Sequence, residues 1–226
     1  MISHKYKCIF IHIPKCAGTS IEVALGHFNT HEGRDGQDHR TIRMIEKPLN
    51  IMDIISSKEN IKEMTRRCYS RIKKVSNPQN KVNLTKQQYK EYYKFTVIRN
   101  PWARVFSWYN NVLNDDMHRK YYGINHQIAL YEFLEKFGGI GMLRPQTHWL
   151  KDFKGEIKLD KIVKFENLID EIQEVLMCIN ASGIVLPHRI KGKINNYTDY
   201  YDEKSIQYIK NKYSEEISIF GYTFDN

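Results

Sequence analysis

A short apolar run that ends at a proline and a loop of small residues constrains the fold of this chain most. Residues 8–13 (CIFIHI) are nearly all apolar and rich in isoleucine, which predicts a buried strand within residues 6–13. Pro14 ends that strand, and residues 19–28 then carry apolar side chains at helical spacing. A buried strand that passes through a tight loop into a helix is the building unit of parallel α/β sheets.

Two further strands are each followed by a helix. Residues 94–98 and 161–165 predict buried strands, with helices starting at Pro101 and covering residues 168–179. Residues 202–220 predict one helix or two. This alternation indicates the α/β class, with a parallel sheet flanked by helices.

The length of 226 residues suits a single domain over residues 1–226, since no repeat or Gly/Ser-rich linker divides the chain. Residues 47–93 are the most basic and polar stretch, and we expect a mainly helical insertion or lid there. Within it, residues 59–75 predict one amphipathic helix. Its apolar face comprises Ile61, Met64, Cys68 and Ile72.

The charge of the chain points to an anionic partner. Thirty-five Lys and Arg against 26 Asp and Glu leave +9, which suits nucleic acid, an acidic glycan, a membrane surface or a phosphate-rich small molecule. No apolar run is long enough for a transmembrane helix, and no leader-like segment is evident. The four cysteines form no C-x-x-C pair, which disfavours a zinc ribbon and a disulfide framework and favours a reducing compartment.

Residues 12–20 (HIPKCAGTS) have the properties of a phosphate-binding loop. Helix N-termini carry unpaired N–H groups that bind phosphate, and Ala17 and Gly18 let the backbone approach an anion closely. Lys15 adds a cation, and two hydroxyls follow the glycine. The loop is not a Walker A motif, because the lysine precedes the glycine. An ordinary capped strand–helix turn is the alternative interpretation.

A second candidate anion site follows the second predicted strand. Arg99 stands at the carboxyl end of that strand, the edge at which open α/β sheets bind ligands. Ser107 follows about two turns into the next helix. A guanidinium and a hydroxyl suit a second phosphate. Alternatively, Arg99 caps a neighbouring helix and Ser107 is a packing residue.

Together the two segments resemble the cofactor signature of sulfotransferases that use 3′-phosphoadenosine 5′-phosphosulfate (PAPS). Residues 14–20 (PKCAGTS) are similar to the 5′-phosphosulfate loop of that family, and residues 99–109 (RNPWARVFSWY) to its 3′-phosphate block. The carbohydrate branch, Golgi-type and bacterial, is the most similar, and only residues 45–93 match it poorly. Further similar blocks lie at residues 146–150, 164–168, 186–188, 196–201 and 219–224.

The resemblance implies the sulfotransferase fold, with a sheet like that of P-loop NTPases. It implies transfer of the sulfuryl group from PAPS to a hydroxyl of a carbohydrate or glycoconjugate, which can itself be anionic. The product adenosine 3′,5′-bisphosphate (PAP) would be released, and neither a metal ion nor nucleic acid is expected. Because no N-terminal anchor precedes the first strand, a soluble, cytoplasmic enzyme of bacterial type is expected.

The resemblance also implies roles for single residues. Lys15 would contact the phosphosulfate bridge, and Arg99 and Ser107 would hold the 3′-phosphate. Residues 189–197 would close over the nucleotide, with a cation from Lys191 or Lys193 and with Tyr197 near the adenine. The 5′-phosphate would be cradled by the backbone N–H groups of Cys16, Ala17, Gly18, Thr19 and Ser20.

Transfer to a hydroxyl also needs a base whose pKa lies near neutrality. The position of His39 is similar to that of a histidine downstream of the loop in this branch, so we predict His39 as the base. We expect His12 to support the loop, while His148, His31 and Glu32 stay open as candidate bases. Two further functions stay open as well: a nucleotide kinase or NTPase, and a non-catalytic basic module that binds glycans or nucleic acid.

Overall fold

The computed structural model describes residues 1–27, 36–124, 128–187 and 196–225, which fall into two compact units. The first unit comprises Met1–Ile98 and Thr147–Ile190, and the second comprises Arg99–Gln146 and Lys191–Asn226. In chain order, the elements of the first unit are β1 (Ile2–Ser3), β2 (Cys8–Ile11), α1 (Gly18–Ala24), α2 (Ile42–Ile45), α3 (Ile51–Ile55), α4 (Lys58–Ile72), η1 (Pro78–Lys81), α5 (Lys86–Glu91), β3 (Tyr93–Ile98), α9 (Thr147–Leu150), β4 (Lys161–Lys164), η3 (Phe165–Asn167) and α10 (Leu168–Cys178).

The sheet of the first unit has the strand order β1-β2-β3-β4, in which β2, β3 and β4 are parallel. The prediction of an α/β fold with a parallel sheet is confirmed, and the three predicted strands correspond to β2, β3 and β4. Thr96 of β3 lies opposite Ile11, and its buried hydroxyl donates to the Ile11 carbonyl over 2.8 Å. The antiparallel strand β1 was not predicted, because two residues are too few for a periodic signal.

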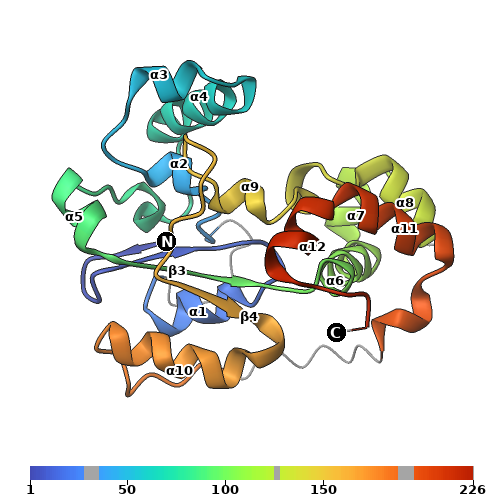
Figure 1. Cartoon of the computed structure of the whole chain (residues 1–226). Coiled ribbons are helices and arrows are strands. Elements are labelled where there is room, and N and C mark those ends of the chain that lie inside the picture. Colours follow the sequence, from blue (N-terminus) through green and yellow to red (C-terminus); the bar gives the residue numbers. More distant parts are fainter. Residues whose placement is uncertain (28–35, 125–127, 188–195, 226) are drawn as a thin grey trace. The chain divides into compact units, whose positions relative to one another are not determined.

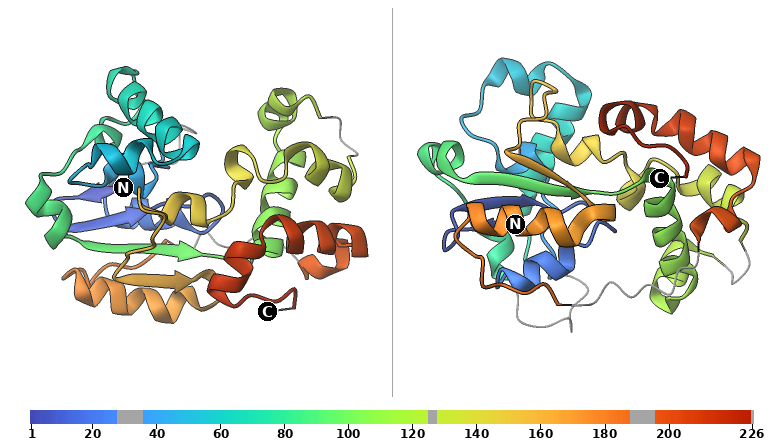
Figure 2. Two further views of the ribbon diagram at one scale, coloured as in Figure 1. Left: turned by 45° about the horizontal axis from the view of Figure 1, so that its top comes forward. Right: turned by 60° about the horizontal axis from the view of Figure 1, so that its bottom comes forward.

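Helices cover both faces of this sheet (Figure 1). α1 and α10 lie on one face, and α2 and α4 lie on the other, as the turned views in Figure 2 also show. The spacing of Leu168, Ile172, Val175 and Leu176 gives α10 one apolar stripe, and all four side chains are buried. α10 contacts β3 and β4, so the predicted helix over 168–179 is confirmed together with its inward face.

The predicted helix in the basic segment is present as α4, but it buries a polar face and exposes its apolar one, the reverse of the usual arrangement. Its buried side chains are Asn60, Glu63 and Arg67. Asn60 donates to the carbonyl of Phe153 over 2.8 Å, and Arg67 donates to the carbonyl of Arg43 over 3.0 Å. The apolar stripe instead faces outward, with Ile61 47% and Ile72 80% exposed. Hydrogen bonding, rather than apolar burial, therefore attaches α4 to the first unit.

The second unit is built of helices in the part that the structure describes. In chain order its elements are α6 (Pro101–Leu113), α7 (Asp116–Tyr122), α8 (Leu130–Phe137), η2 (Gly141–Leu143), η4 (Tyr197–Tyr200), α11 (Glu203–Lys212) and α12 (Ser214–Phe220). α6 begins at Pro101 as predicted, and the Asn100 side chain caps it by accepting from two backbone N–H groups. The C-terminal segment, for which one helix or two were predicted, forms two.

The expectation of one domain over residues 1–226 stays a prediction. Residues 47–93 are mainly helical in the structure, with α3, α4, η1 and α5 in this segment. Among the helices that the structure describes, none combines the length and the apolar character needed to cross a membrane.

Candidate active site

The loop between β2 and α1 has an uncommon backbone conformation. Lys15 and Ala17 have φ angles of 68° and 58°, in the left-handed region that non-glycine residues rarely adopt. Between them, Cys16 is buried, and its thiol lies 3.6 Å from the carbonyl oxygen of Pro14. α1 then starts at Gly18, and no side chain caps its first turn. Strained backbone of this kind persists where the surroundings enforce it, and it is frequent at ligand sites.

The His12 side chain packs directly against Gly18. A Cβ atom on residue 18 would lie only 2.0 Å from Cδ2 of His12, so only glycine fits at this position. The imidazole of His12 is buried and also stacks on Phe10. The ring of His12 thus packs directly against the start of α1, and its role as a support of the loop stays a prediction.

A buried carboxylate partners His12. Nδ1 of His12 lies 3.0 Å from Oε1 of Glu22 on α1, and the same oxygen accepts the backbone N–H of Asp38 over 3.1 Å. Burial acts to raise the pKa of Glu22, but the charge and the hydrogen bond of His12 outweigh it, so the pKa is lowered. Glu22 therefore stays ionised and connects α1 to two segments that are distant in sequence.

Residues 37–39 dock onto this arrangement. The Gln37 side chain donates to the hydroxyl of Thr19 over 2.8 Å, and the backbone N–H of Asp38 donates to Glu22. Nδ1 of His39 lies 3.2 Å from the backbone oxygen of His12, and the two imidazole centroids are 4.2 Å apart. Three consecutive residues are thereby held against the loop, α1 and the end of β2, and His39 is placed beside the loop.

The contact with His12 fixes the tautomer of His39. A carbonyl oxygen only accepts, so Nδ1 of His39 carries the proton and donates it to that oxygen. Nε2 then keeps its lone pair when the ring is neutral. Burial lowers the pKa of His39 to about 4, and the charge of His12 acts in the same direction. At neutral pH, His39 therefore offers an unprotonated nitrogen, but its pKa lies below the near-neutral value that the sequence analysis expected of the base.

The candidate base His148 has both ring nitrogens engaged. Its Nδ1 lies 3.2 Å from Oε1 of Glu59, and its Nε2 lies 3.6 Å from Oε1 of Glu63. A histidine between two carboxylates is suited to an ion pair rather than to accepting a substrate proton. The candidate bases His31 and Glu32 lie outside the described residues.

His148 and its two carboxylate neighbours form the one cluster of metal-ligating side chains found among the residues that the structure describes. One ligand atom from each of Glu59, Glu63 and His148 lies within 4.8 Å of the others. Both oxygens of Glu63 already accept hydrogen bonds, from Arg66 over 2.5 Å and from Thr41 over 2.6 Å. The guanidinium at this carboxylate opposes a further cation, so we assign no metal to the cluster.

In the second unit, the backbone of Arg99 is held from both sides by one amide. Gln146 accepts the N–H of Arg99 over 2.9 Å and donates to its carbonyl over 2.8 Å. Gln146 in turn donates from its backbone N–H and its side chain to Glu216, whose pKa is raised to about 7 by burial. Sequence patterns do not reveal this pair of residues. Gln146 stands in a block that resembles the family, but nothing in its spacing indicates Arg99 as its partner.

The remaining predicted residues fall in the second unit or outside the described residues. Ser107 lies on α6 and is half-buried. Tyr197 donates its hydroxyl to the Phe224 carbonyl, and its ring packs edge-on against Phe224 and Tyr201. Lys191 and Lys193 lie outside the described residues. The assigned roles of Ser107 and Tyr197 stay predictions.

A comparison with protein families decides the class of the protein. A model described as the sulfotransferase family matches residues 1–223 and thus extends across both units. The chain belongs to the sulfotransferase family. The resemblance noted in the sequence is confirmed, and the α/β sheet flanked by helices agrees with the sulfotransferase fold. Among curated proteins and among solved structures, no significant match to the chain was found.

We expect Gly18→Ala to destabilise the sulfotransferase, because the added methyl group overlaps the His12 ring. Overpacking of this kind costs about 1–3 kcal/mol in the free energy of unfolding, measured by urea denaturation. Gly183→Ala is the matched control, since a Cβ there meets nothing within 4 Å, and we expect a change within about 0.5 kcal/mol. The double variant His12→Ala/Gly18→Ala should lose about 1 kcal/mol less stability than the sum of the losses of the two single variants. Strict additivity would contradict the contact.

We expect His39 of the sulfotransferase to remain neutral, with its proton on Nδ1, down to about pH 4. Long-range proton–nitrogen NMR spectra over a pH series report both properties, and His39→Gln identifies the signal. Because the folded-state pKa lies below the value of about 6.5 in the unfolded chain, the stability that this group contributes is complete above pH 6.5 and is lost as the pH falls to about 4. A midpoint near 6.5, or an Nε2–H tautomer, would contradict the assignment.

Proposed function

We propose that this sulfotransferase transfers the sulfuryl group of PAPS to a hydroxyl of a carbohydrate or glycoconjugate, with His39 as the base. The observation that carries the proposal is the docking of residues 37–39 against the loop and the end of β2. It brings a neutral imidazole beside a loop that combines a lysine, strained backbone and uncapped helical N–H groups.

In the proposal, the loop binds the phosphosulfate end of the donor. The backbone N–H groups of residues 16–20 cradle the 5′-phosphate, and Lys15 contacts the bridging oxygen. The left-handed conformations of Lys15 and Ala17 support this role, because they turn successive N–H groups of a tight loop toward one side, where an anion binds. His12 holds the loop in this shape through its contact with Gly18.

The reaction needs one proton transfer and one displacement. The acceptor oxygen forms a bond to sulfur while the bond from sulfur to the bridging oxygen breaks, and that electron pair remains on the 5′-phosphate of PAP. Lys15 neutralises the charge that develops on this oxygen. Nε2 of His39 takes the proton of the acceptor hydroxyl. The hydrogen bond from Nδ1 to His12 orients the ring and stabilises the imidazolium that forms.

The 3′-phosphate is assigned to the second unit. Arg99 and Ser107 supply a guanidinium and a hydroxyl, and the amide of Gln146 fixes the backbone from which the Arg99 side chain projects. Tyr197 is assigned to the adenine. Its ring belongs to a cluster with Tyr201 and Phe224 in which the rings pack edge to face, and this cluster supplies aromatic surface near η4.

We place the enzyme in the cytoplasm as part of the proposal. All four cysteines are free thiols, and two of them, Cys68 and Cys178, are exposed, which suits a reducing compartment. The acceptor is proposed to be a saccharide because the resemblance in sequence lies with the carbohydrate branch. Nothing in the reaction scheme calls for a metal ion.

Nucleotide binding tests the donor. By isothermal titration without Mg²⁺, we expect PAP to bind at least about tenfold more tightly than ATP with Mg²⁺, a difference of about 1.4 kcal/mol. Lys15→Ala should weaken PAP binding about tenfold or more, while Lys7→Ala, at an exposed lysine that also has a positive φ, should not. Arg99→Ala should weaken PAP binding but leave the binding of adenosine 5′-monophosphate, which lacks the 3′-phosphate, unchanged. Equal or tighter binding of ATP with Mg²⁺ would favour a nucleotide kinase.

Turnover tests the base. With PAPS labelled in the sulfuryl group and mixed oligosaccharides, we expect His39→Ala to lower the rate about 10²–10⁴-fold with PAP affinity intact. His4→Ala is the control, because the described hydrogen bond of His4 joins it to the Tyr92 hydroxyl and not to the loop. Normal turnover of His39→Ala would reject His39, and loss in His148→Ala alone would move the role to His148. No transfer by the unmodified protein to any saccharide would contradict the proposed acceptor class.

A further inference from the structure

The outward face of α4 carries a line of mainly apolar side chains from Ile61 to Ile72. Ile61, Thr65, Cys68 and Ile72 are spaced by four, three and four residues, which places them in one line on a helix, and all four are exposed. Tyr69 beside this line is more than half exposed. The helix therefore presents to solvent the face that a helix of a globular protein normally buries.

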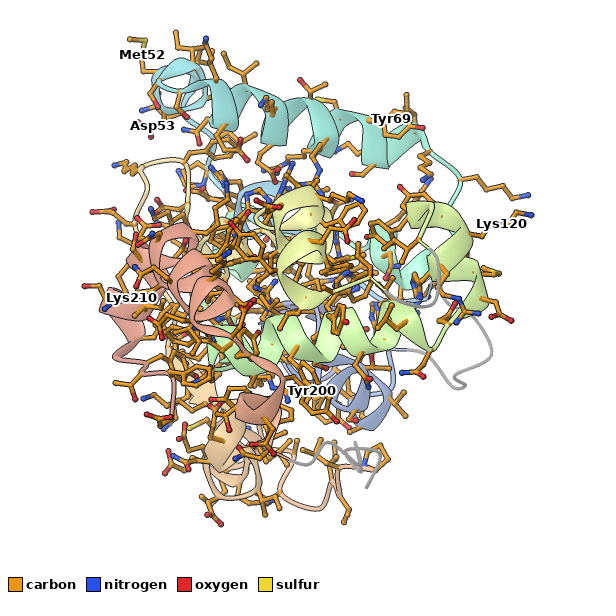
Figure 3. The ribbon with its side chains drawn as sticks, turned by 90° about the vertical axis from the view of Figure 1, so that its right-hand side faces the viewer. Met52, Asp53, Tyr69, Lys120, Tyr200 and Lys210 are labelled. Atoms are coloured by element: carbon orange, nitrogen blue, oxygen red, sulfur yellow. The ribbon has the colours of Figure 1, made fainter. Side chains whose placement is uncertain are left out.

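The short helix α3 extends this surface. α3 contacts α4 and contains no buried residue. Its side chains Ile51, Met52 and Ile55 are each more than half exposed. Figure 3 shows Met52 and Tyr69 projecting outward from α3 and α4. Single exposed apolar residues are ordinary, but six large ones on two packed helices indicate a binding surface. We call Ile51, Met52, Ile55, Ile61, Tyr69 and Ile72 the α3–α4 face.

The inner side of α4 is hydrogen-bonded to the first unit, so the side chains of the α3–α4 face are not needed to attach the helix. Asn60, Glu63 and Arg67 occupy that side, and each is hydrogen-bonded to groups of the same unit. Because these buried polar groups are hydrogen-bonded, their burial costs little, whereas the isoleucines on the outer side remain in contact with water. If another apolar phase covers the α3–α4 face, its apolar side chains leave water, which is favourable.

The exposed charged residues around the α3–α4 face are all basic. Within residues 51–74, every charged residue that the structure classes as exposed is Lys or Arg, whereas Asp53 and Glu59 are half-buried and Glu63 is buried. Lys58 and Lys62 flank Ile61 on the same side of α4, where their long side chains can lie along an apolar surface and keep their charges in water. The exposed cations are Lys58, Lys62, Arg66, Arg71, Lys73 and Lys74.

We propose that the α3–α4 face docks peripherally on the surface of an anionic lipid bilayer. Isoleucine, methionine and tyrosine on one side with flanking Lys and Arg is the composition of helices that lie in the plane of a bilayer interface. Lys and Arg near an anionic leaflet add attraction that salt weakens. This proposal is independent of the sulfotransferase reaction, since no residue of the α3–α4 face belongs to the proposed active site.

Two different occupants fit the surface less well. A second copy of the chain would pair two faces of the same positive charge in a symmetric dimer, which is repulsive. Nucleic acid would match the cations but would leave the isoleucines without an apolar partner. Of these three occupants, the bilayer is the one that matches both the apolar residues and the cations.

Vesicle sedimentation of the full chain tests the proposal. We expect partitioning onto vesicles of 70% phosphatidylcholine and 30% phosphatidylglycerol at 0.1 M NaCl, with much weaker partitioning onto phosphatidylcholine alone or at 0.5 M NaCl. Ile61→Ser/Ile72→Ser should lower the partition coefficient roughly tenfold. Ile169→Ser/Val185→Ser is the matched control, because these side chains are 71% and 84% exposed elsewhere in the same unit. No binding to anionic vesicles, or equal losses in the two variants, would overturn the proposal.

The two exposed cysteines provide a second readout that does not depend on a destabilising change. Cys68 lies on the outward line of α4, and Cys178 lies at the end of α10. An environment-sensitive dye on Cys68 in Cys178→Ser should brighten and shift to the blue when anionic vesicles are added. The dye on Cys178 in Cys68→Ser should not respond. If the Cys68 dye responds instead to protein concentration without lipid, with a matching increase in sedimentation coefficient, the surface is a dimer interface and the bilayer proposal is wrong.

Discussion

The arrangement of the loop, α1 and His39 depends on one contact, between the imidazole of His12 and Gly18. The ring occupies the place where any other residue at position 18 would carry its side chain. From that place, its Nδ1 reaches Glu22, and the backbone oxygen of the same residue receives His39. If the ring were displaced, the start of α1 and the buried carboxylate would lose their contacts with it, and His39 would lose the neighbouring ring whose centroid lies 4.2 Å away. A single buried side chain therefore couples loop geometry to the position of His39.

Gly18 is needed because a side chain at this position would overlap the His12 ring, not because its backbone adopts an unusual conformation. The left-handed φ angles belong to Lys15 and Ala17, which carry a steric cost that a glycine would avoid. Gly18 itself has no positive φ. The loop thus tolerates strain at two positions in order to keep a lysine and a closely packed helix start. Strain that the surroundings enforce is a feature of preorganised sites.

Periodicity in the sequence predicted the three parallel strands, the helices after them and the segments that carry the loop and Arg99. It did not predict which face of α4 is buried, because a pattern of 3.6 residues shows that two faces differ but not which one another element covers. Likewise, the docking of residues 37–39 and the clamp of Gln146 on Arg99 join residues 16 to 47 positions apart through polar contacts. Such contacts leave no periodic signal, so only the resemblance to a family brought His39 into consideration.

The places where the chain departs from local rules are therefore informative. Folding alone would favour glycine at positions 15 and 17, because glycine adopts a positive φ without steric strain. It would favour polar residues at positions 61 and 72, because isoleucine there exposes apolar surface to water. The chain retains lysine and alanine in the first pair and isoleucine in the second. Departures that folding does not require are expected at sites that meet another molecule. The strained loop meets the donor in our proposal, and the α3–α4 face meets the bilayer, so each departure has a separate physical partner.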